Sequence, residues 1–407
     1  ILAQVVAPSH PRACRPALTA PAAMASTMMG TTFLGVRSEA NPVGYAWRQR
    51  PMPRLQHPTD ILARVHKTTI CGTDLHILGG NVPQAKVGLG LGHEGIVDIL
   101  EVGSEVKRFK VGDRVLCCCI SACGTCKKCK DRWFGNCEAA EGSWSLGHLI
   151  DGFQAEYVRV PHADLSCYAL PASCPRDSPE EDKYLMLADI LPTSYEIGLV
   201  DGDMADGKTC AIVGVGPVGL AALLAACSMY KAKAIIAIDL DEGRLELATR
   251  FGATHTVCPP KGDGAPAAVR DEVLRLLGDG EDGVDVVVEA VGLPGGWYIA
   301  QEIVKPGGNV AILGVHGRPV TLNLERMWYR NFKLTAGMVH GYSIPRLMEK
   351  VEDGSLRADL LISHHWKLSQ IEDAYAKFES RRDGALKMLL CNDRPGQAPK
   401  ANSPNVV

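Results

Sequence analysis

The fold is decided by one stretch, Thr209-Cys210-Ala211-Ile212-Val213-Gly214-Val215-Gly216-Pro217-Val218-Gly219. The apolar run 209–213 predicts a buried strand, and the uncharged run 217–230 predicts a helix. Between and within them, three glycines follow the spacing G-x-G-x-x-G. Glycine lets the backbone of such a turn approach a pyrophosphate, and the start of the helix, at Pro217 and Val218, favours its negative charge. The stretch therefore predicts a dinucleotide-binding turn.

The sequence after this turn alternates between strand and helix patterns. Apolar runs at 234–239, 284–289 and 309–314 predict further strands, and apolar residues at helical spacing lie between strands, for example from Val269 to Leu277. This alternation predicts a parallel sheet covered by helices on both faces. The uncharged stretch 209–230 is long enough to cross a bilayer, but the glycines and Pro217 interrupt it, so we predict no membrane span.

Asp239 lies twenty residues after Gly219, at the end of the next predicted strand. A carboxylate there can accept the ribose hydroxyls of NAD and would repel the extra phosphate of NADP, so the sequence favours NAD. The alternative role for Asp239 is a helix cap, for which Asp241 is better placed. Arg244 is a candidate contact for the adenosine end of the cofactor, or a solvated helix residue.

Four cysteines follow one another closely, at Cys123, Cys126, Cys129 and Cys137. This spacing can close a tetrahedral thiolate shell around zinc and leaves no position for a substrate, so it predicts a structural zinc. The basic residues between the ligands would offset the thiolate charge. The alternative is a disulfide pair or a set of buried thiols, because the neighbouring residues 117–119 are also cysteines.

A second group of metal-ligand residue types lies earlier in the chain, at Cys71, His93 and Glu94. A thiolate, an imidazole and a carboxylate can form a zinc shell that keeps one position open for a substrate. Taken alone, these residues leave the question open, since a lone histidine is more often a satisfied core residue.

The composition is that of an ordinary globular protein, with 46% hydrophobic and 22% charged residues in 407. The net charge of −3 gives no electrostatic footprint for nucleic acid or an anionic membrane, so we predict a small-molecule partner. Fifteen cysteines without a secretory signal indicate a reducing compartment, and the prediction is cytoplasmic. Residues 1–30 have no acidic residue and predict a disordered leader, or alternatively a mitochondrial transit peptide.

From about Ala46 to Leu390 the chain resembles the zinc-dependent medium-chain alcohol dehydrogenases. It is most similar to the bacterial and fungal branch that contains the secondary-alcohol enzymes, on the motifs Ile70–Ile77, Leu146–Gly152 and Leu187–Ser194. The resemblance implies a mostly β, GroES-like catalytic domain, 31–192 and 336–407, and an inserted NAD-binding domain, 193–335. The inserted domain would be a Rossmann domain, with a doubly wound parallel sheet in an α/β fold.

The resemblance also implies roles for single residues. Asp189 becomes the third ligand of the catalytic zinc with Cys71 and His93, and Glu94 enters the shell transiently. Thr73 would hydrogen-bond the alcohol, and His76 would pass its proton onward. Thr73 could instead be a helix N-cap, His76 a surface residue and Asp189 a plain helix or turn residue.

Two further positions carry open questions. Trp144 matches a residue that lines the substrate pocket of the secondary-alcohol enzymes, but it could equally be ordinary core. Relatives read Gly-His-Glu-x-x-Gly, whereas Val97 stands here at the last position. A β-branched residue in place of glycine puts the local backbone in doubt.

The prediction is therefore an oxidoreductase with two zinc ions per chain that transfers a hydride between a small primary or secondary alcohol and NAD. The alternatives are a polyol, threonine or formaldehyde dehydrogenase, and a non-catalytic homologue that binds dinucleotides. By analogy with relatives we expect a homo-oligomer, a dimer or tetramer.

Overall fold

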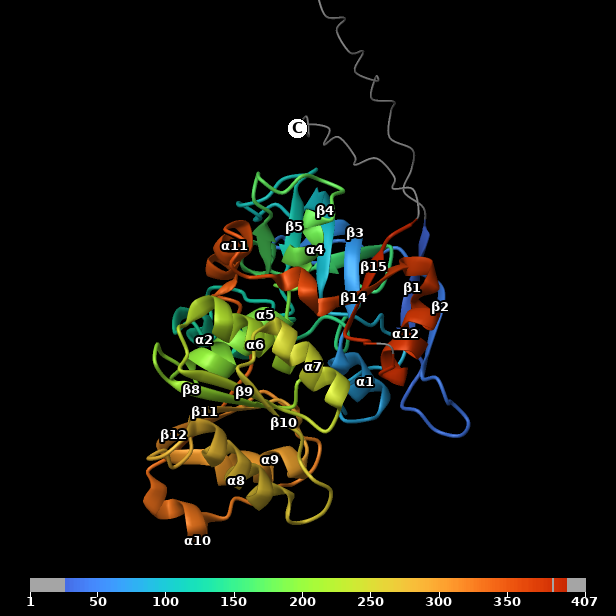
Figure 1. Cartoon of the computed structure of the whole chain (residues 1–407). Helices are drawn as coiled ribbons and strands as arrows, with labels where there is room; N and C mark the ends of the chain where they lie inside the picture. Colours follow the sequence, from blue (N-terminus) through green and yellow to red (C-terminus); the bar gives the residue numbers. More distant parts are fainter. Residues whose placement is uncertain (1–25, 383, 394–407) are drawn as a thin grey trace, which may run out of the picture.

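The computed structural model describes residues 26–382 and 384–393. Two large sheets form the molecule, with helices between and outside them (Figure 1). The predicted leader lies outside the described residues except for 26–30, of which 27–30 begin strand β1. Within the part of the chain that is described, no helix combines the length and the apolar character needed to cross a membrane.

The predicted parallel sheet is confirmed. Its order is β10-β9-β8-β11-β12-β13 and all its pairs are parallel, which is the Rossmann order. The strands are β8 (Thr209–Val213), β9 (Ala234–Ile238), β10 (His255–Val257), β11 (Val284–Glu289), β12 (Val304–Ile312) and β13 (Lys333–Ala336). Strand β12 begins five residues before the predicted run 309–314, because Pro306-Gly307-Gly308 interrupts its apolar pattern.

Helices cover both faces of this sheet, as the alternation of its strands requires. Helices α6 and α7 lie on one side of the sheet, and α8 and α9 lie on the other (Figure 1). In β8, Cys210 and Ile212 belong to the core cluster shared with α6 and α7, whereas Ala211 and Val213 belong to the cluster shared with α8 and α9. The helices are α6 (Pro217–Met229), α7 (Glu242–Phe251), α8 (Ala265–Leu277) and α9 (Pro294–Ile303). Both faces of β8 are buried, and this explains why its sequence is apolar without alternation.

The second sheet is mixed and has seven strands, with β6 added beside β3. The strands are β3 (Ile61–Ile70), β4 (Gly95–Val102), β5 (Arg114–Cys117), β6 (Tyr157–Val160), β7 (Cys167–Ala169), β14 (Ile362–Lys367) and β15 (Lys387–Cys391). A separate pair is formed by β1 (Thr27–Phe33) and β2 (Tyr45–Pro51). Because β15 pairs with β3, the end of the described chain lies against its first half.

The remaining helices are mostly short. They are α1 (Gly72–Leu78), α2 (Lys127–Lys130), α3 (Ala163–Ser166), α4 (Glu180–Leu185), α5 (Ile190–Thr193), α10 (Leu324–Met327), α11 (Ile344–Glu352) and α12 (Ile371–Ser380). A π-helix, η2 (Ser194–Val200), follows α5 directly. The 3₁₀ turns are η1 (Phe134–Asn136), η3 (Trp328–Arg330), η4 (Ala358–Leu361) and η5 (Leu368–Gln370).

One hydrophobic core joins the two halves. It contains Ile96 of β4 and Leu116 of β5 together with Leu220 and Leu223 of α6, and all four are fully buried. A fully buried leucine or isoleucine contributes roughly 1.5–3 kcal/mol. Leu187, two residues before Asp189, belongs to the same cluster, so the core fixes the α4–α5 segment between the sheets.

Val97 does not disturb the backbone. It lies within β4, pairs with Val65 and Val115, and is fully buried. Its φ is not positive, so glycine is not required there. The close approach falls two residues earlier, where a Cβ on Gly95 would meet Phe153 Cδ1 at 2.5 Å.

Candidate active site and metal centres

The site begins where β3 ends and α1 starts. Cys71 occupies the N-cap position of α1, and its backbone N–H donates to Asp74 Oδ2 at 3.0 Å. Asp74 is buried and also accepts a hydrogen bond from Gln154 Nε2 at 2.9 Å. This aspartate therefore fixes the turn that presents the Cys71 side chain.

The structure brings together Cys71, His93, Glu94 and Asp189, with one ligand atom from each within 4.8 Å of the others. Asp189 Oδ2 lies 3.4 Å from Cys71 Sγ and 3.3 Å from His93 Nε2. Glu94 Oε1 lies 3.9 Å from His93 Nε2. Three segments far apart in the sequence thus converge on one point.

Asp189 is not a cap, although it stands at the N-cap position of α5. Its side chain makes no capping hydrogen bond to the helix backbone. Instead Oδ1 accepts from the Thr193 hydroxyl at 3.0 Å, and Oδ2 faces the cysteine and the histidine. The backbone at Asp189 (φ −147°, ψ −74°) is not helical, and its carboxylate lies between the Thr193 hydroxyl and the cysteine–histidine pair.

The donor set fits a zinc ion. Cys71, Glu94 and Asp189 are three acidic groups, and the buried cation beside them is Lys387. Glu94 Oε2 is buried without a hydrogen-bond partner, as is His93 Nδ1, which faces Asp74 Oδ1 at 3.7 Å. A carboxylate behind a ligating imidazole is the usual outer support of a metal-bound histidine. Thiolate, imidazole and carboxylate together suit zinc.

The four cysteines of the predicted structural site also converge, with their sulfurs within 4.8 Å of one another. They are free thiols, so the disulfide alternative does not hold. Backbone N–H groups point at the sulfurs, from Cys126 to Cys123 Sγ and from Cys129 to Cys126 Sγ, each at 3.4 Å. Such donors stabilise thiolates, and an all-sulfur tetrad fits a closed zinc site.

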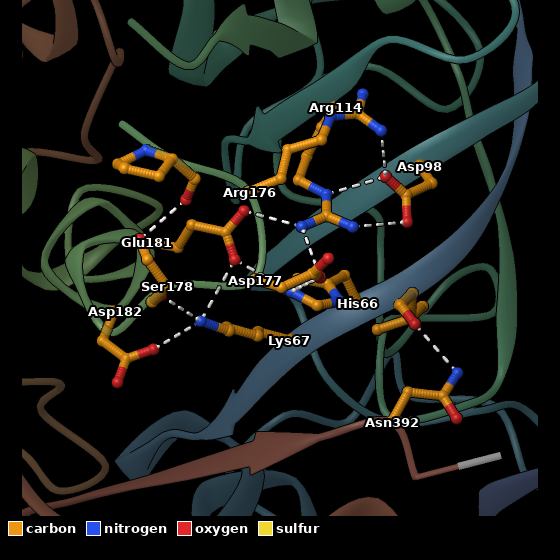
Figure 2. Close-up of polar contacts among 12 residues, drawn as sticks. His66, Lys67, Asp98, Arg114, Arg176, Asp177, Ser178, Glu181, Asp182 and Asn392 are labelled. Carbon is orange, nitrogen blue, oxygen red and sulfur yellow. Dashed lines mark hydrogen bonds and ion pairs between the residues drawn. The ribbon is translucent and has the colours of Figure 1, made fainter. Parts of the chain in front are cut away.

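A third cluster, His66, Asp177 and Glu181, also has ligand atoms at metal-like spacing (Figure 2). Its oxygens are already used: Arg114 Nη1 lies 2.7 Å from Glu181 Oε1, and Lys67 Nζ lies 3.2 Å from Glu181 Oε2. Two fixed cations at this distance would repel a metal ion. This cluster instead ties α4 to β3 and β5, close to the segment that carries Asp189.

A cavity of about 1850 Å³ runs between the two halves of the molecule. Its lining includes two residues of the candidate metal shell, Cys71 and Asp189, and the nearby Thr73 and His76 of α1. It also includes predicted cofactor residues, Gly214, Gly216, Pro217, Val218, Asp239 and Arg244. The metal shell and the dinucleotide turn therefore share one space.

The glycines of the turn have distinct roles. Gly214 has φ +89°, and a Cβ there would lie 2.5 Å from Val291 Cγ2. Gly219 does not line the cavity; a Cβ there would lie 1.9 Å from the Gly214 carbonyl oxygen, so it allows α6 to pack on β8. Gly216 leaves the backbone open toward the cavity, where the nearest outside atom to a Cβ is Arg244 Nη1 at 3.8 Å.

Asp239 lies beside this turn. Its Oδ2 accepts from the Val215 N–H at 2.8 Å, and its Oδ1 accepts from the Asp241 N–H at 3.0 Å. The cap of α7 is Asp241, whose side chain accepts from the Arg244 N–H at 3.1 Å. The guanidinium of Arg244 approaches Asp239 Oδ2 at 4.0 Å.

Thr73 and His76 lie three residues apart in α1, a spacing that puts both on one face of the helix. Both line the cavity. Thr73 is not the N-cap of α1, and its Oγ1 lies 3.7 Å from Cys71 Sγ. His76 is half-buried, and its Nδ1 lies 3.1 Å from Asn81 Nδ2.

Comparison with known proteins agrees with this geometry. The domain family "Alcohol dehydrogenase GroES-like domain" matches residues 57–172, and "Zinc-binding dehydrogenase" matches residues 217–353. An alcohol dehydrogenase of Cupriavidus necator is 33% identical over 359 residues, which cover 84% of this chain and 94% of the relative. The chain belongs to the zinc-dependent medium-chain alcohol dehydrogenase family.

Other members of the family are similar over comparable lengths. An L-threonine 3-dehydrogenase of a Shewanella strain is 27% identical, with 84% of this chain and 95% of the relative covered. The apo structure of zinc dependent alcohol dehydrogenase 2 from Streptococcus pneumonia has a TM-score of 0.81 and 42% identity, covering 91% of this chain and 99% of that one. A putative zinc-binding dehydrogenase from Sinorhizobium meliloti 1021, bound to NADP, has a TM-score of 0.75 and 26% identity, covering 90% and 100%.

In this alcohol dehydrogenase fold, Trp144 lies next to His93, one of the candidate metal ligands. Its ring meets the His93 ring edge-on, with the centroids 6.0 Å apart, and stacks on the His148 ring, with the centroids 3.8 Å apart. It is partly buried and is not among the residues that line the cavity. Burial lowers the pKa of His148 to about 4, so this ring is neutral near pH 7.

Lys387, a fully buried residue of β15, is not predicted by the sequence motifs. Its Nζ pairs with Glu94 Oε1, and both side chains are 1% exposed. Burial alone would lower the pKa of Lys387, but the nearby charges of Glu94, Cys71 and Asp189 outweigh it and raise this pKa. A signal was present, since Lys387 is the one charge in the apolar run 385–390.

Proposed function

We propose that this protein is an NAD-dependent zinc enzyme that interconverts a small primary or secondary alcohol and the corresponding aldehyde or ketone. The observation that carries the proposal is the single cavity shared by the metal shell and the dinucleotide turn. In such a cavity an alcohol at the metal shell and a nicotinamide ring can meet, which hydride transfer requires.

The residues have defined tasks in this proposal. Cys71, His93 and Asp189 would hold the catalytic zinc, with Glu94 as a carboxylate in reserve. Zinc supplies Lewis acidity that lowers the pKa of an alcohol, and the nicotinamide ring supplies the hydride acceptor. Thr73 orients the substrate hydroxyl through a hydrogen bond and takes up its proton. His76, on the same face of α1, passes that proton toward solvent.

For the cofactor we propose NAD rather than NADP. Asp239 places a carboxylate beside the turn, where it would accept ribose hydroxyls and repel a phosphate. Arg244 Nη1 lies 4.0 Å from Asp239 Oδ2, where the guanidinium would offset part of the carboxylate charge. The NADP bound in the Sinorhizobium meliloti relative makes this choice worth testing directly.

We further propose a second, structural zinc at Cys123, Cys126, Cys129 and Cys137, giving two zinc ions per chain. The domains would be 31–192 and 336–407 for catalysis and 193–335 for the cofactor. A homo-oligomer is proposed as well, since the outer edge of β13 has no strand partner among the described residues and Trp328, Tyr329 and Leu334 are exposed near it. The cytoplasmic location remains a prediction.

The test is turnover of a panel of small primary and secondary alcohols, polyols and threonine with NAD and with NADP. We expect the highest kcat/KM for a simple alcohol with NAD. The Shewanella relative makes threonine the leading alternative substrate. Binding of NADH without turnover of any alcohol would contradict the proposal and favour a non-catalytic homologue.

A further inference from the structure

Cys119 lies in the segment after β5, against the backbone that carries Asp189. Its N–H donates to the carbonyl oxygen of Ala188, the residue before Asp189, at 2.9 Å. Its side chain is buried, and its Sγ lies 3.6 Å from Asp189 Oδ1. One residue thus contacts both the backbone and the side chain of the proposed ligand segment.

The two oxygens of Asp189 have different surroundings. Oδ2 faces Cys71 Sγ at 3.4 Å and His93 Nε2 at 3.3 Å, so it is the oxygen at the metal shell. Oδ1 is contacted by the Thr193 hydroxyl at 3.0 Å and by the Cys119 thiol at 3.6 Å. A carboxylate oxygen can only accept, so the thiol and the hydroxyl must both donate to Oδ1.

We propose that Cys119 is a positioning residue for the catalytic metal ligand Asp189. With Thr193 it holds Oδ1 by hydrogen bonding and leaves Oδ2 for the metal. The backbone N–H of Cys119 binds the Ala188 carbonyl oxygen and so also holds the peptide that precedes Asp189. The inference rests on the proposed catalytic metal site, because it assigns to Cys119 a role that acts through Asp189.

The neighbouring thiols provide the contrast. Cys117 is equally buried but faces Cys167 across paired strands, with the two sulfurs 3.7 Å apart. Within the described part of the chain, its sulfur makes no hydrogen bond to a proposed ligand of the catalytic metal. Cys117 therefore fills space in the core, whereas Cys119 supports a ligand.

The experiment compares Cys119→Ala and Cys119→Ser with wild type and with Cys117→Ala as the matched control. Purified full-length protein is titrated with a zinc chelator, and zinc release from the two sites is followed. An outer partner of a metal ligand typically contributes 10-fold to 100-fold in affinity, and a thiol is a weak donor, so we expect Cys119→Ala to weaken the catalytic site about tenfold. Serine, which keeps a donor, should stay within about threefold of wild type. The four-cysteine site should release its zinc at an unchanged chelator concentration and serves as the internal reference.

The outcomes separate the inference from the proposed function. If Asp189→Asn loses the catalytic zinc but Cys119→Ala keeps wild-type affinity, the inference is wrong and the proposed function stands. If Asp189→Asn also keeps the zinc, the ligand set itself is wrong. Should Cys119→Ala not fold, Cys119→Val removes the donor while filling the space, and equal zinc affinities of the Val and Ser variants would overturn the inference.

Discussion

A buried ion pair lies beside the candidate site. Lys387 and Glu94 form an ion pair in which each side chain is 1% exposed. Removing one partner of such a pair leaves the other charge buried without compensation, which is far more costly than losing an exposed pair. This pair lies beside the metal shell, so stability and site geometry depend on the same two residues.

We expect Lys387→Met to lower the free energy of unfolding by about 3–5 kcal/mol. The control is Lys110→Met, which removes an ion pair to Asp113 whose lysine is 83% exposed and which should cost no more than about 1 kcal/mol. Both are measured by denaturant unfolding. The double variant Lys387→Met with Glu94→Gln should recover part of the loss, and equal costs for Lys387→Met and Lys110→Met would contradict this account.

His76 makes a pH-dependent prediction. Burial lowers the pKa of His76 from its ordinary value of 6.5. The neutral ring is the form that accepts a proton, so alcohol oxidation should stay high through neutral pH and fall only as pH drops below 6.5. His76→Ala should be slower and should lose this acid limb in a kcat/KM profile. Added imidazole should partly restore the rate, and a profile identical to wild type would leave proton release to water.

At the scale of elements, the two candidate metal sites differ in how they are built. The four-cysteine site would take all its ligands from the segment 123–137, around α2 and η1. The candidate catalytic site would take its ligands from the start of α1, the residues before β4 and the N-cap of α5. A metal at the four-cysteine site would close a local loop, whereas the candidate catalytic ligands are held in place by the surrounding core.

We therefore expect Cys126→Ser to lower both the melting temperature and the zinc content, because structural zinc contributes directly to folding. Cys71→Ser should abolish turnover in a protein that remains folded and still binds NADH. Metal analysis, thermal melts and NADH fluorescence distinguish the two variants. Active wild-type protein with fewer than two zinc ions per chain would contradict the proposal that both groups of residues bind zinc.

At the scale of the whole molecule, the cavity depends on how the two sheets are placed. It combines residues of α1 and α5 with the ends of β8 and β9. The hydrophobic core that joins β4 and β5 to α6 holds these parts together. Asp239, the residue proposed to decide cofactor choice, lines the same cavity as the candidate metal ligands Cys71 and Asp189.

We expect wild-type protein to favour NAD over NADP in kcat/KM by at least about tenfold, which corresponds to about 1.4 kcal/mol. Asp239→Gly should reduce this preference, because it removes the charge that opposes the extra phosphate. Asp241→Ala, at the cap of α7, is the control and should cost about 1 kcal/mol of stability without changing the preference. A wild-type preference for NADP would show that Asp239 does not face the ribose.

Features whose residues lie close together in the chain can be predicted from local sequence patterns. The strand, glycine turn and helix at 209–229 follow from local patterning. The four-cysteine site follows from the spacing of its cysteines within fifteen positions. Only the family resemblance predicts Asp189 as a metal ligand, because the residues around it are typical of a helix start. Lys387 pairs with Glu94 across 293 residues, and Cys119 reaches Asp189 across 70. Such contacts depend on which buried surfaces pack together when the chain folds, so local sequence patterns do not predict them.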